Sequence, residues 1–213
     1  MAQKSLDINQ WLQQKYFEKE TLIRLFHIFS AQQPFPHLVL QHFLQHNQAE
    51  LLRDALLQKT FTTKESDLFS LHQTGDLHGS KNHAILGFIQ FFESPAFHAF
   101  LNKITGMIFA SRIDVSGSAY APTNYLLAHN DLVEKRALAF NYYLTPNFTE
   151  NDGGELQLFS THNQIPQHIA QSYPAAFNTL IIFAVSADSF HQVAEVVGDK
   201  ERLALSGWFH EKN

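Results

Sequence analysis

The arrangement of apolar and polar positions changes near residue 106. In the first half of the chain, apolar side chains recur at helical spacing, which predicts helices over residues 7–33, 47–58, 84–92 and 95–104. Asp7 is the expected N-cap of the first helix, and Gly106 the expected end of the last. A short strand is expected at residues 37–40. The polar residues 60–79 predict either a loop over the functional site or an edge strand.

From residue 107 onward, short apolar runs are separated by turn residues. These runs predict strands over residues 107–113, 120–129, 138–144, 155–159, 179–185 and 202–210. Gly198 and Asp199 predict a hairpin turn into the last strand, and residues 161–176 are expected to form a loop. Many short strands joined by Gly, Pro and Asn turns favour a jelly roll or a barrel.

Composition narrows the classes of function. The net charge is −5 and no run of Lys or Arg exceeds two residues, so a surface that coats nucleic acid is not expected. Because the chain has no cysteine, any transition metal must be bound by nitrogen and oxygen ligands. The N-terminus lacks the apolar segment of a signal peptide, and no apolar run reaches transmembrane length. We therefore expect a cytoplasmic protein without a membrane partner.

His129 and Asp131 are the first candidates for a metal site. On a strand, residues two apart face the same side, so this imidazole and this carboxylate can bind one ion. Thirteen histidines make a chance His-x-Asp pattern common. However, the apolar residues 125–128 predict a strand entering the core, where a lone carboxylate is costly. His191 completes a set of two histidines and one carboxylate, which is typical of non-haem Fe(II) sites with open positions. The other histidines, including His162, His168 and His210, are assigned to loops or a strand end.

Arg202 is a candidate for binding a carboxylate. It is expected on the partner strand of His191, one hairpin away, with alternate residues from Arg202 to Trp208 facing inward. A guanidinium inside a barrel requires a carboxylate partner, and the distal carboxylate of 2-oxoglutarate would provide one. The alternative is a surface arginine paired with Glu195 or Glu201.

Tyr120 also has two interpretations. Its ring can simply pack in the core, or its phenol can donate to the same carboxylate as Arg202, since buried tyrosine hydroxyls usually find a partner.

Several longer stretches resemble prolyl-hydroxylase-type Fe(II)/2-oxoglutarate dioxygenases, specifically the ribosomal prolyl-hydroxylase branch typified by the yeast termination-and-polyadenylation protein. The resemblance covers residues 34–210, nearly the whole chain. The matching stretches are Pro34-Phe35-Pro36-His37, Asp67-Leu68-Phe69, Thr74-Gly75-Asp76-Leu77, Tyr125-Leu126-Leu127-Ala128-His129-Asn130-Asp131, Arg136-Ala137-Leu138-Ala139-Phe140, Gly153-Gly154-Glu155-Leu156, Ser189-Phe190-His191-Gln192-Val193 and Ser206-Gly207-Trp208-Phe209-His210.

The resemblance implies an α+β fold, a double-stranded β-helix (jelly roll) supported by N-terminal helices. It implies one dioxygenase domain over residues 1–213, the catalytic domain only, with helical support and the first strand in 1–105 and the β-helix core in 106–213. The implied iron ligands are His129, Asp131 and His191, with Arg202 and Tyr120 binding 2-oxoglutarate. The implied cofactors are Fe(II), 2-oxoglutarate and supporting ascorbate. The implied partners are O2 and a proline-containing protein or peptide that is hydroxylated, with a ribosomal or translation protein as the candidate substrate.

Three other functions stay open at this point. The first is a 2-oxoglutarate dioxygenase that acts on a free amino acid or a small molecule. The second is a cupin-like metal protein that uses the same barrel without 2-oxoglutarate. The third is a binding module without catalysis, which the retained charged residues argue against, because buried charges are costly to keep.

Overall fold

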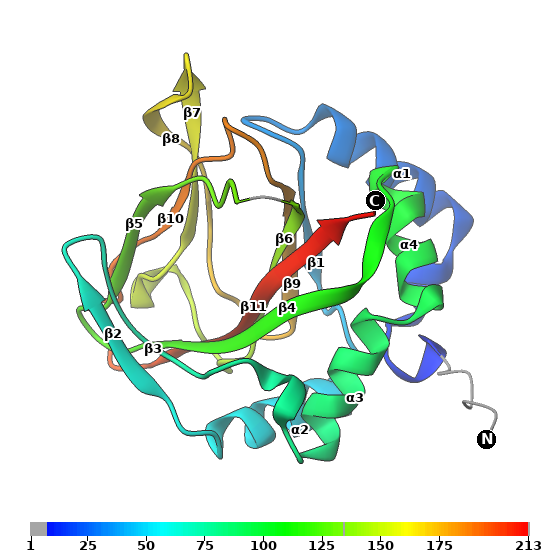
Figure 1. The fold of residues 1–213 in the computed structure, drawn as a ribbon, viewed down its shortest axis with the longest axis horizontal. Coiled ribbons are helices and arrows are strands. Elements are labelled where there is room, and N and C mark those ends of the chain that lie inside the picture. Colours follow the sequence, from blue (N-terminus) through cyan, green and yellow to red (C-terminus); the bar gives the residue numbers. More distant parts are fainter. Residues whose placement is uncertain (1–7, 134, 213) are drawn as a thin grey trace.

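A curled antiparallel sheet forms the body of the molecule (Figure 1). The structure is a computed structural model that describes residues 8–133 and 135–212, so the expected cap Asp7 lies outside the described residues. Within these ranges the strand order is β1-β9-β6-β11-β4-β3-β5-β10-β7-β8, with β2 paired to β3. The strands are β1 His37–Gln41, β2 Thr62–Ser66, β3 Phe69–Gln73, β4 Phe109–Tyr120, β5 Tyr125–His129, β6 Arg136–Tyr143, β7 Leu156–His162, β8 Ile165–Tyr173, β9 Thr179–Ala184, β10 His191–Val193 and β11 Arg202–Glu211.

In the described part of the chain, four α-helices cover the outer face of one half of this sheet (Figure 1). They are α1 Lys19–Ala31, α2 His46–Leu57, α3 His83–Phe92 and α4 Pro95–Thr105. Phe92 of α3 shows how they pack: its ring centroid lies 5.1 Å from that of Phe140 on β6 and 5.8 Å from that of Phe209 on β11. The many phenylalanines therefore join the helices to the sheet.

Alternation along β6 separates two cores. Leu138, Phe140 and Tyr142 face the helices, whereas Ala139 and Tyr143 face the interior of the curl. The same alternation holds in β11, where Leu203 and Leu205 face outward and Ala204 inward. This is the double-stranded β-helix with supporting helices that was expected, and its interior is available for a site.

The predicted helices over 47–58, 84–92 and 95–104 are confirmed to within one or two residues as α2, α3 and α4. Gly106 ends α4 in the left-handed conformation, with φ of 74°. The single helix predicted over 7–33 is wrong in its first half. Short 3-10 turns at Ile8–Gln10 and Gln14–Phe17 precede α1, because the Gln13 amide bonds to the Phe43 carbonyl instead of continuing a helix.

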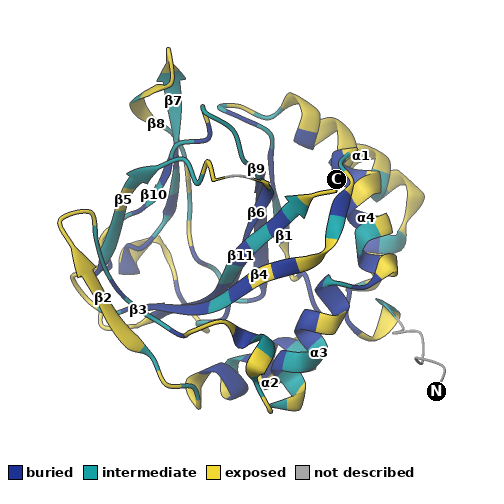
Figure 2. Ribbon diagram, in the orientation of Figure 1, coloured by how far each residue is buried: buried dark blue, intermediate teal, exposed yellow. Residues whose placement is uncertain are grey.

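Two segments of low apolar content form strands. Residues 161–176 were expected as a loop, but Ile165–Tyr173 form β8, which pairs with β7. Residues 60–79 contain the β2–β3 hairpin, of which β2 is the expected edge strand and β3 lies between β4 and β5. Figure 2 shows both hairpins projecting with exposed residues. An edge strand that solvent reaches on both faces carries no apolar alternation, so its sequence resembles a loop.

One predicted strand and one predicted turn are also wrong. The strand predicted over 120–129 is interrupted, because Tyr120 ends β4 and Asn124 accepts from the Ala121 amide in a turn before β5. Gly198 and Asp199 do not form a hairpin turn between paired strands, since β11 pairs with β4 and β6, whereas β10 pairs with β5 and β7.

No single helix among the described residues is long and apolar enough to cross a membrane. The α3–α4 pair, bent by 51°, passes that test together by length and composition only. Phe88, Phe92 and Phe97 of this pair are fully buried.

Candidate active site

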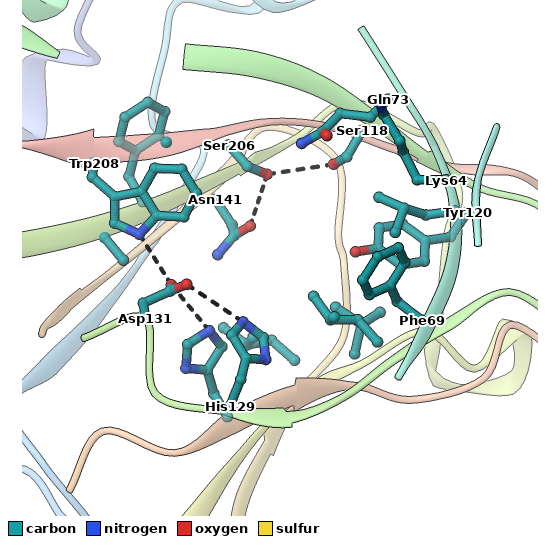
Figure 3. Close-up of a pocket in the computed structure, with 18 residues that line it drawn as sticks. Lys64, Phe69, Gln73, Ser118, Tyr120, His129, Asp131, Asn141, Ser206 and Trp208 are labelled. Carbon is teal, nitrogen blue, oxygen red and sulfur yellow. Dashed lines mark hydrogen bonds and ion pairs between the residues drawn. The ribbon is translucent and has the colours of Figure 1, made fainter. Parts of the chain in front are cut away.

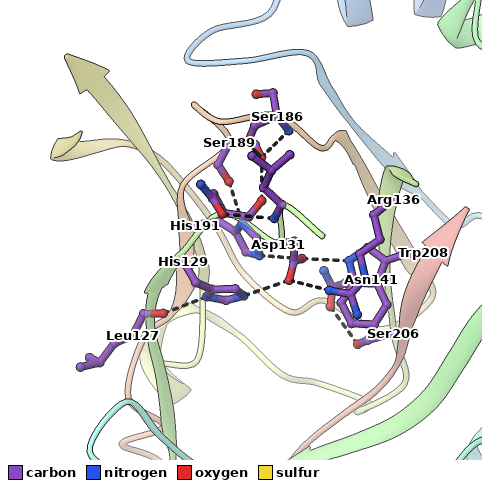
Figure 4. A network of polar contacts seen from close by, with 12 residues as sticks. Leu127, His129, Asp131, Arg136, Asn141, Ser186, Ser189, His191, Ser206 and Trp208 are labelled. Carbon is purple, nitrogen blue, oxygen red and sulfur yellow. Dashed lines mark hydrogen bonds and ion pairs between the residues drawn. The ribbon is translucent and has the colours of Figure 1, made fainter. Parts of the chain in front are cut away.

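His129 and His191 lie opposite each other on the paired strands β5 and β10 (Figure 4). Their ring centroids are 4.2 Å apart. Asp131 follows β5 with φ of 58°, a left-handed conformation that aspartate tolerates better than most residues. Its Oδ1 lies 3.5 Å from His129 Nε2 and its Oδ2 lies 3.3 Å from His191 Nε2. The structure thus brings together the three residues predicted from the sequence.

Both imidazoles are oriented by backbone carbonyls. His129 Nδ1 lies 2.9 Å from the Leu127 carbonyl oxygen, and His191 Nδ1 lies 2.9 Å from the Ser189 carbonyl oxygen. A carbonyl can only accept, so in each neutral ring the proton is on Nδ1 and the Nε2 lone pair is free. Nε2 is therefore the ligand atom that each histidine offers.

The protonation states suit a metal site. Burial alone would raise the pKa of Asp131, but the adjacent His191 and His129 imidazoles and the hydrogen bond from Trp208 lower it to about 2. Burial, together with the neighbouring His191, lowers the pKa of His129 to about 4. Metal ligands must be deprotonated, so both groups are ready to bind at neutral pH. One candidate ligand atom from each of the three residues lies within 4.8 Å of the others. Two nitrogens and one carboxylate fit Fe(II).

Arg202 is buried, with only 1% of its surface exposed, and lacks a carboxylate partner among the described residues. Its terminal nitrogen donates to the Tyr143 hydroxyl at 3.3 Å, while its Nε has no hydrogen-bond partner in the described part of the chain. The guanidinium carbon lies 5.0 Å from the Tyr120 ring centroid and 4.8 Å from that of Tyr143. A buried cation in this state is costly, and a ligand carboxylate would compensate it.

A cavity of about 270 Å³ opens beside these residues (Figure 3). His129, Asp131 and His191 line one end of it, and Tyr120 lines its wall. Arg202 does not itself line the cavity, but it lies next to Tyr120, its register partner across β4 and β11. The cavity therefore connects a metal-binding end to the neighbourhood of an uncompensated cation.

Residues 115–210 match the family model of the 2OG-Fe(II) oxygenase superfamily, a stretch that includes His129, Asp131, His191, Tyr120 and Arg202. The chain belongs to this superfamily. Its curated relatives include prolyl 3-hydroxylase OGFOD1 of Xenopus laevis, 39% identical over 181 residues, which are 83% of this chain and 35% of that protein. Prolyl 3-hydroxylase sudestada1 of Drosophila melanogaster is 33% identical over 220 residues, 96% of this chain and 40% of that protein. The chain thus spans well under half the length of either relative.

The fold is also shared with solved structures. A Pseudomonas putida prolyl-4-hydroxylase superposes with a TM-score of 0.74 over 90% of this chain and 100% of that one, at 16% identity. At this identity the likeness establishes the fold of the 2OG-Fe(II) oxygenase domain and nothing further.

The structure corrects three interpretations of this oxygenase site. Arg202 does not lie on a partner strand of His191; it reaches the interior from β11, on the other side of the curl. The run 125–128 does not enter the core, because β5 is half-buried and Leu127 is 44% exposed. Neither Glu195 nor Glu201 forms an ion pair with Arg202 in the described structure, so the surface interpretation of Arg202 is wrong.

Other residues contact the site although the sequence indicated no contact with Arg202 or Asp131 for them. Tyr143 bonds to Arg202, and Trp208 and Arg136 both contact Asp131 (Figure 4). Inward alternation along β11 indicated Trp208, but no pattern indicated Arg136, whose partner lies across a loop. His168 contacts Ser160, and His210 pairs with Asp114 at 3.1 Å. His129, Asp131 and His191 form the one metal-ligand group of its kind among the described residues.

Proposed function

We propose that residues 1–213 act as one catalytic domain, an Fe(II)- and 2-oxoglutarate-dependent dioxygenase that hydroxylates a prolyl residue in a protein or peptide. One observation carries the proposal. The same curled sheet presents a cluster of two histidines and one aspartate at one end and the buried, uncompensated Arg202 further along. Two such costly features in one interior are accounted for together by a metal and a dicarboxylate.

In this proposal His129, Asp131 and His191 hold Fe(II) through Nε2, a carboxylate oxygen and Nε2. Arg202, with Tyr120 and Tyr143 around it, binds the distal carboxylate of 2-oxoglutarate. Burial raises the pKa of Tyr120 to about 12, so its hydroxyl stays protonated and can donate to that carboxylate. When bound, iron and 2-oxoglutarate supply the oxidation, in which 2-oxoglutarate, O2 and a C–H bond yield succinate, CO2 and a C–OH group. The protein residues orient the ligands and exclude water.

The prolyl substrate is supported by the relatives named as prolyl 3-hydroxylases. Both are more than twice as long as the stretch they share with this chain, so a ribosomal or translation protein as the target is the finer part of the proposal. Ascorbate, which would keep iron reduced between turnovers, is likewise part of it.

Anaerobic titration with Fe(II) and then 2-oxoglutarate tests the proposal. We expect a weak visible charge-transfer band that is absent from the Arg202→Ala and Asp131→Ala variants. Arg112→Ala, in which an exposed arginine is removed, is the control and should retain the band. Proline-containing peptides are then screened for a gain of one oxygen atom together with succinate release.

The outcomes separate the rival functions. Metal binding without the band would favour a cupin-like protein, and no metal binding would favour a binding module. Turnover of 2-oxoglutarate with free amino acids or small molecules, but never with peptides, would contradict the prolyl substrate while keeping the dioxygenase.

A further inference from the structure

Asn141 lies on β6, between the metal-ligand cluster and Tyr143, and lines the cavity. Its register partner on β11 is Ser206, whose Oγ donates to Asn141 Oδ1 at 2.8 Å. Because the hydroxyl engages the amide oxygen, the amide nitrogen turns the other way, and Figure 3 shows it directed into the cavity. No described residue accepts a hydrogen bond from this nitrogen.

A short polar row crosses the cavity wall at this point. Ser206 Oγ also lies 3.4 Å from Ser118 Oγ on β4, so side chains of three adjacent strands are connected. Both serines line the cavity, whose remaining wall here is largely apolar, with Ala139, Leu156 and Val193. An amide donor held in such surroundings with nothing to donate to indicates a ligand oxygen.

We propose that Asn141 is a co-substrate-binding residue, whose amide nitrogen donates to the carboxylate of a 2-oxo dicarboxylate that lies nearest to the metal-ligand cluster. Ser206 is the positioning residue that holds the amide in this orientation. The inference rests on the proposed function and deepens it. It assigns a binding residue to the end of the co-substrate that lies opposite Arg202.

The strand geometry supports this ligand. Asn141 and Tyr143 share a face of β6 and stand about 7 Å apart along the strand, and Tyr143 is the residue that accepts from Arg202. A dicarboxylate whose far end lies at Arg202 therefore extends past Asn141 toward His129, Asp131 and His191.

The placement argues against the other candidate ligand, the peptide. Asn141 is half-buried on a central strand with β9 and β11 on either side. The exposed lining residue Lys64, by contrast, marks the part of the cavity that solvent reaches.

Equilibrium binding to the Fe(II)-loaded chain without O2 tests the assignment. Two probes are compared: 2-oxoglutarate, and 4-oxobutanoate, which lacks the carboxylate next to the oxo group. Asn141→Leu keeps the volume and removes the donor. We expect it to weaken 2-oxoglutarate binding roughly ten- to a hundred-fold, the effect of a hydrogen bond to a charged group, and to leave 4-oxobutanoate binding unchanged. Arg202→Ala should weaken both probes.

Three further variants keep the result decisive if 4-oxobutanoate binds too weakly to measure. Asn141→Asp is isosteric and repels a carboxylate, so it should lose more 2-oxoglutarate affinity than Asn141→Leu does. If Asn141 served only to accept the hydrogen bond from Ser206, Asn141→Asp should instead lose less 2-oxoglutarate affinity than Asn141→Leu, because aspartate keeps the acceptor. Ser206→Ala should weaken 2-oxoglutarate binding, whereas Ser206→Thr, which keeps the hydroxyl, should restore it. Asn47→Leu, on the exposed face of α2, is the matched control.

Equal weakening of both probes in Asn141→Leu, or no weakening of either, would overturn the assignment while the band and the Arg202→Ala result leave the proposed function standing. Failure of the unmodified Fe(II)-loaded chain to bind 2-oxoglutarate would overturn both together.

Discussion

The indole nitrogen of Trp208 donates a hydrogen bond to Oδ2 of Asp131 at 3.0 Å. The Arg136 guanidinium lies over the Trp208 ring, 3.5 Å from its centroid, with a terminal nitrogen 3.7 Å from Asp131 Oδ1. Side chains of β11 and β6 therefore hold the carboxylate.

Trp208→Phe should weaken metal binding. The change keeps an aromatic ring under Arg136 but removes the only donor of the indole, so Asp131 loses a hydrogen bond that orients it. Loss of such an outer partner typically costs about ten- to a hundred-fold in metal affinity. Competition with a metal-sensitive dye measures the effect. Trp11→Phe, which alters a tryptophan stacked on Phe91 in the helical layer, is the control and should keep full metal affinity. Equal losses in the two variants would remove Trp208 from this role.

Arg202→Met should make the ligand-free protein more stable. The guanidinium is buried without a carboxylate, and an unsatisfied buried polar group costs roughly 1–3 kcal/mol. Methionine fills a similar volume without the charge, so the free energy of unfolding should rise by about that amount. Denaturant unfolding with and without 2-oxoglutarate measures it. The ligand should stabilise the unmodified protein and have no effect on the variant. A variant that is less stable without ligand would mean that the present surroundings already compensate Arg202.

His37 should make stability depend on pH. Burial lowers its pKa; its Nδ1 contacts the Phe35 carbonyl and its Nε2 the Tyr173 hydroxyl, each at 2.7 Å. A folded-state pKa below the unfolded value of about 6.5 means that the neutral ring is favoured by the fold. Its contribution is therefore complete above about pH 6.5 and is lost as the pH falls through the lower, folded-state pKa.

The comparison that isolates this effect is between the unmodified protein and His37→Gln. The pKa values of His98 and His129 are also lowered by burial, so both proteins should lose stability in acid. Urea unfolding at a series of pH values from neutral to mildly acidic gives the difference. The gap between the two proteins should narrow as the pH falls, and a constant gap would contradict the prediction.

The limits of prediction from the sequence follow from the same contacts. His129 and Asp131 could be found because a histidine and a carboxylate two residues apart stay close together in the chain, which is a local property. The expected strand does not reach Asp131, however, because β5 ends at His129 and Asp131 has φ of 58°. The contact of Asp131 with Trp208 depends on where β11 lies in the sheet, and strand order is set by crossovers that leave no local pattern. Arg202 illustrates this well. Its burial followed from alternation along β11, whereas the choice of neighbouring strand required the sheet order.

The polar strand β8 was missed for a different reason. The segment 165–173 exposes residues on both faces, so no buried side imposes alternation, and the composition resembles a loop. The interruption of the first predicted helix was equally invisible, because it is stabilised by hydrogen bonds to Phe43 and Leu44, which are distant in sequence.

Lys64 offers a test of the β2–β3 hairpin as a binding element for peptides. It lies on the exposed edge strand β2, yet it lines the cavity beside Tyr120 and Phe69 (Figure 3). A cation at this position would face a bound peptide rather than the co-substrate end at Arg202. Lys64→Glu should therefore raise the KM for a peptide substrate several-fold and leave 2-oxoglutarate binding unchanged. Glu65→Lys, an equal and opposite change at the next residue, which does not line the cavity, is the control. If Lys64→Glu changes neither KM, or changes the KM for 2-oxoglutarate instead, the hairpin does not contact the peptide through this residue.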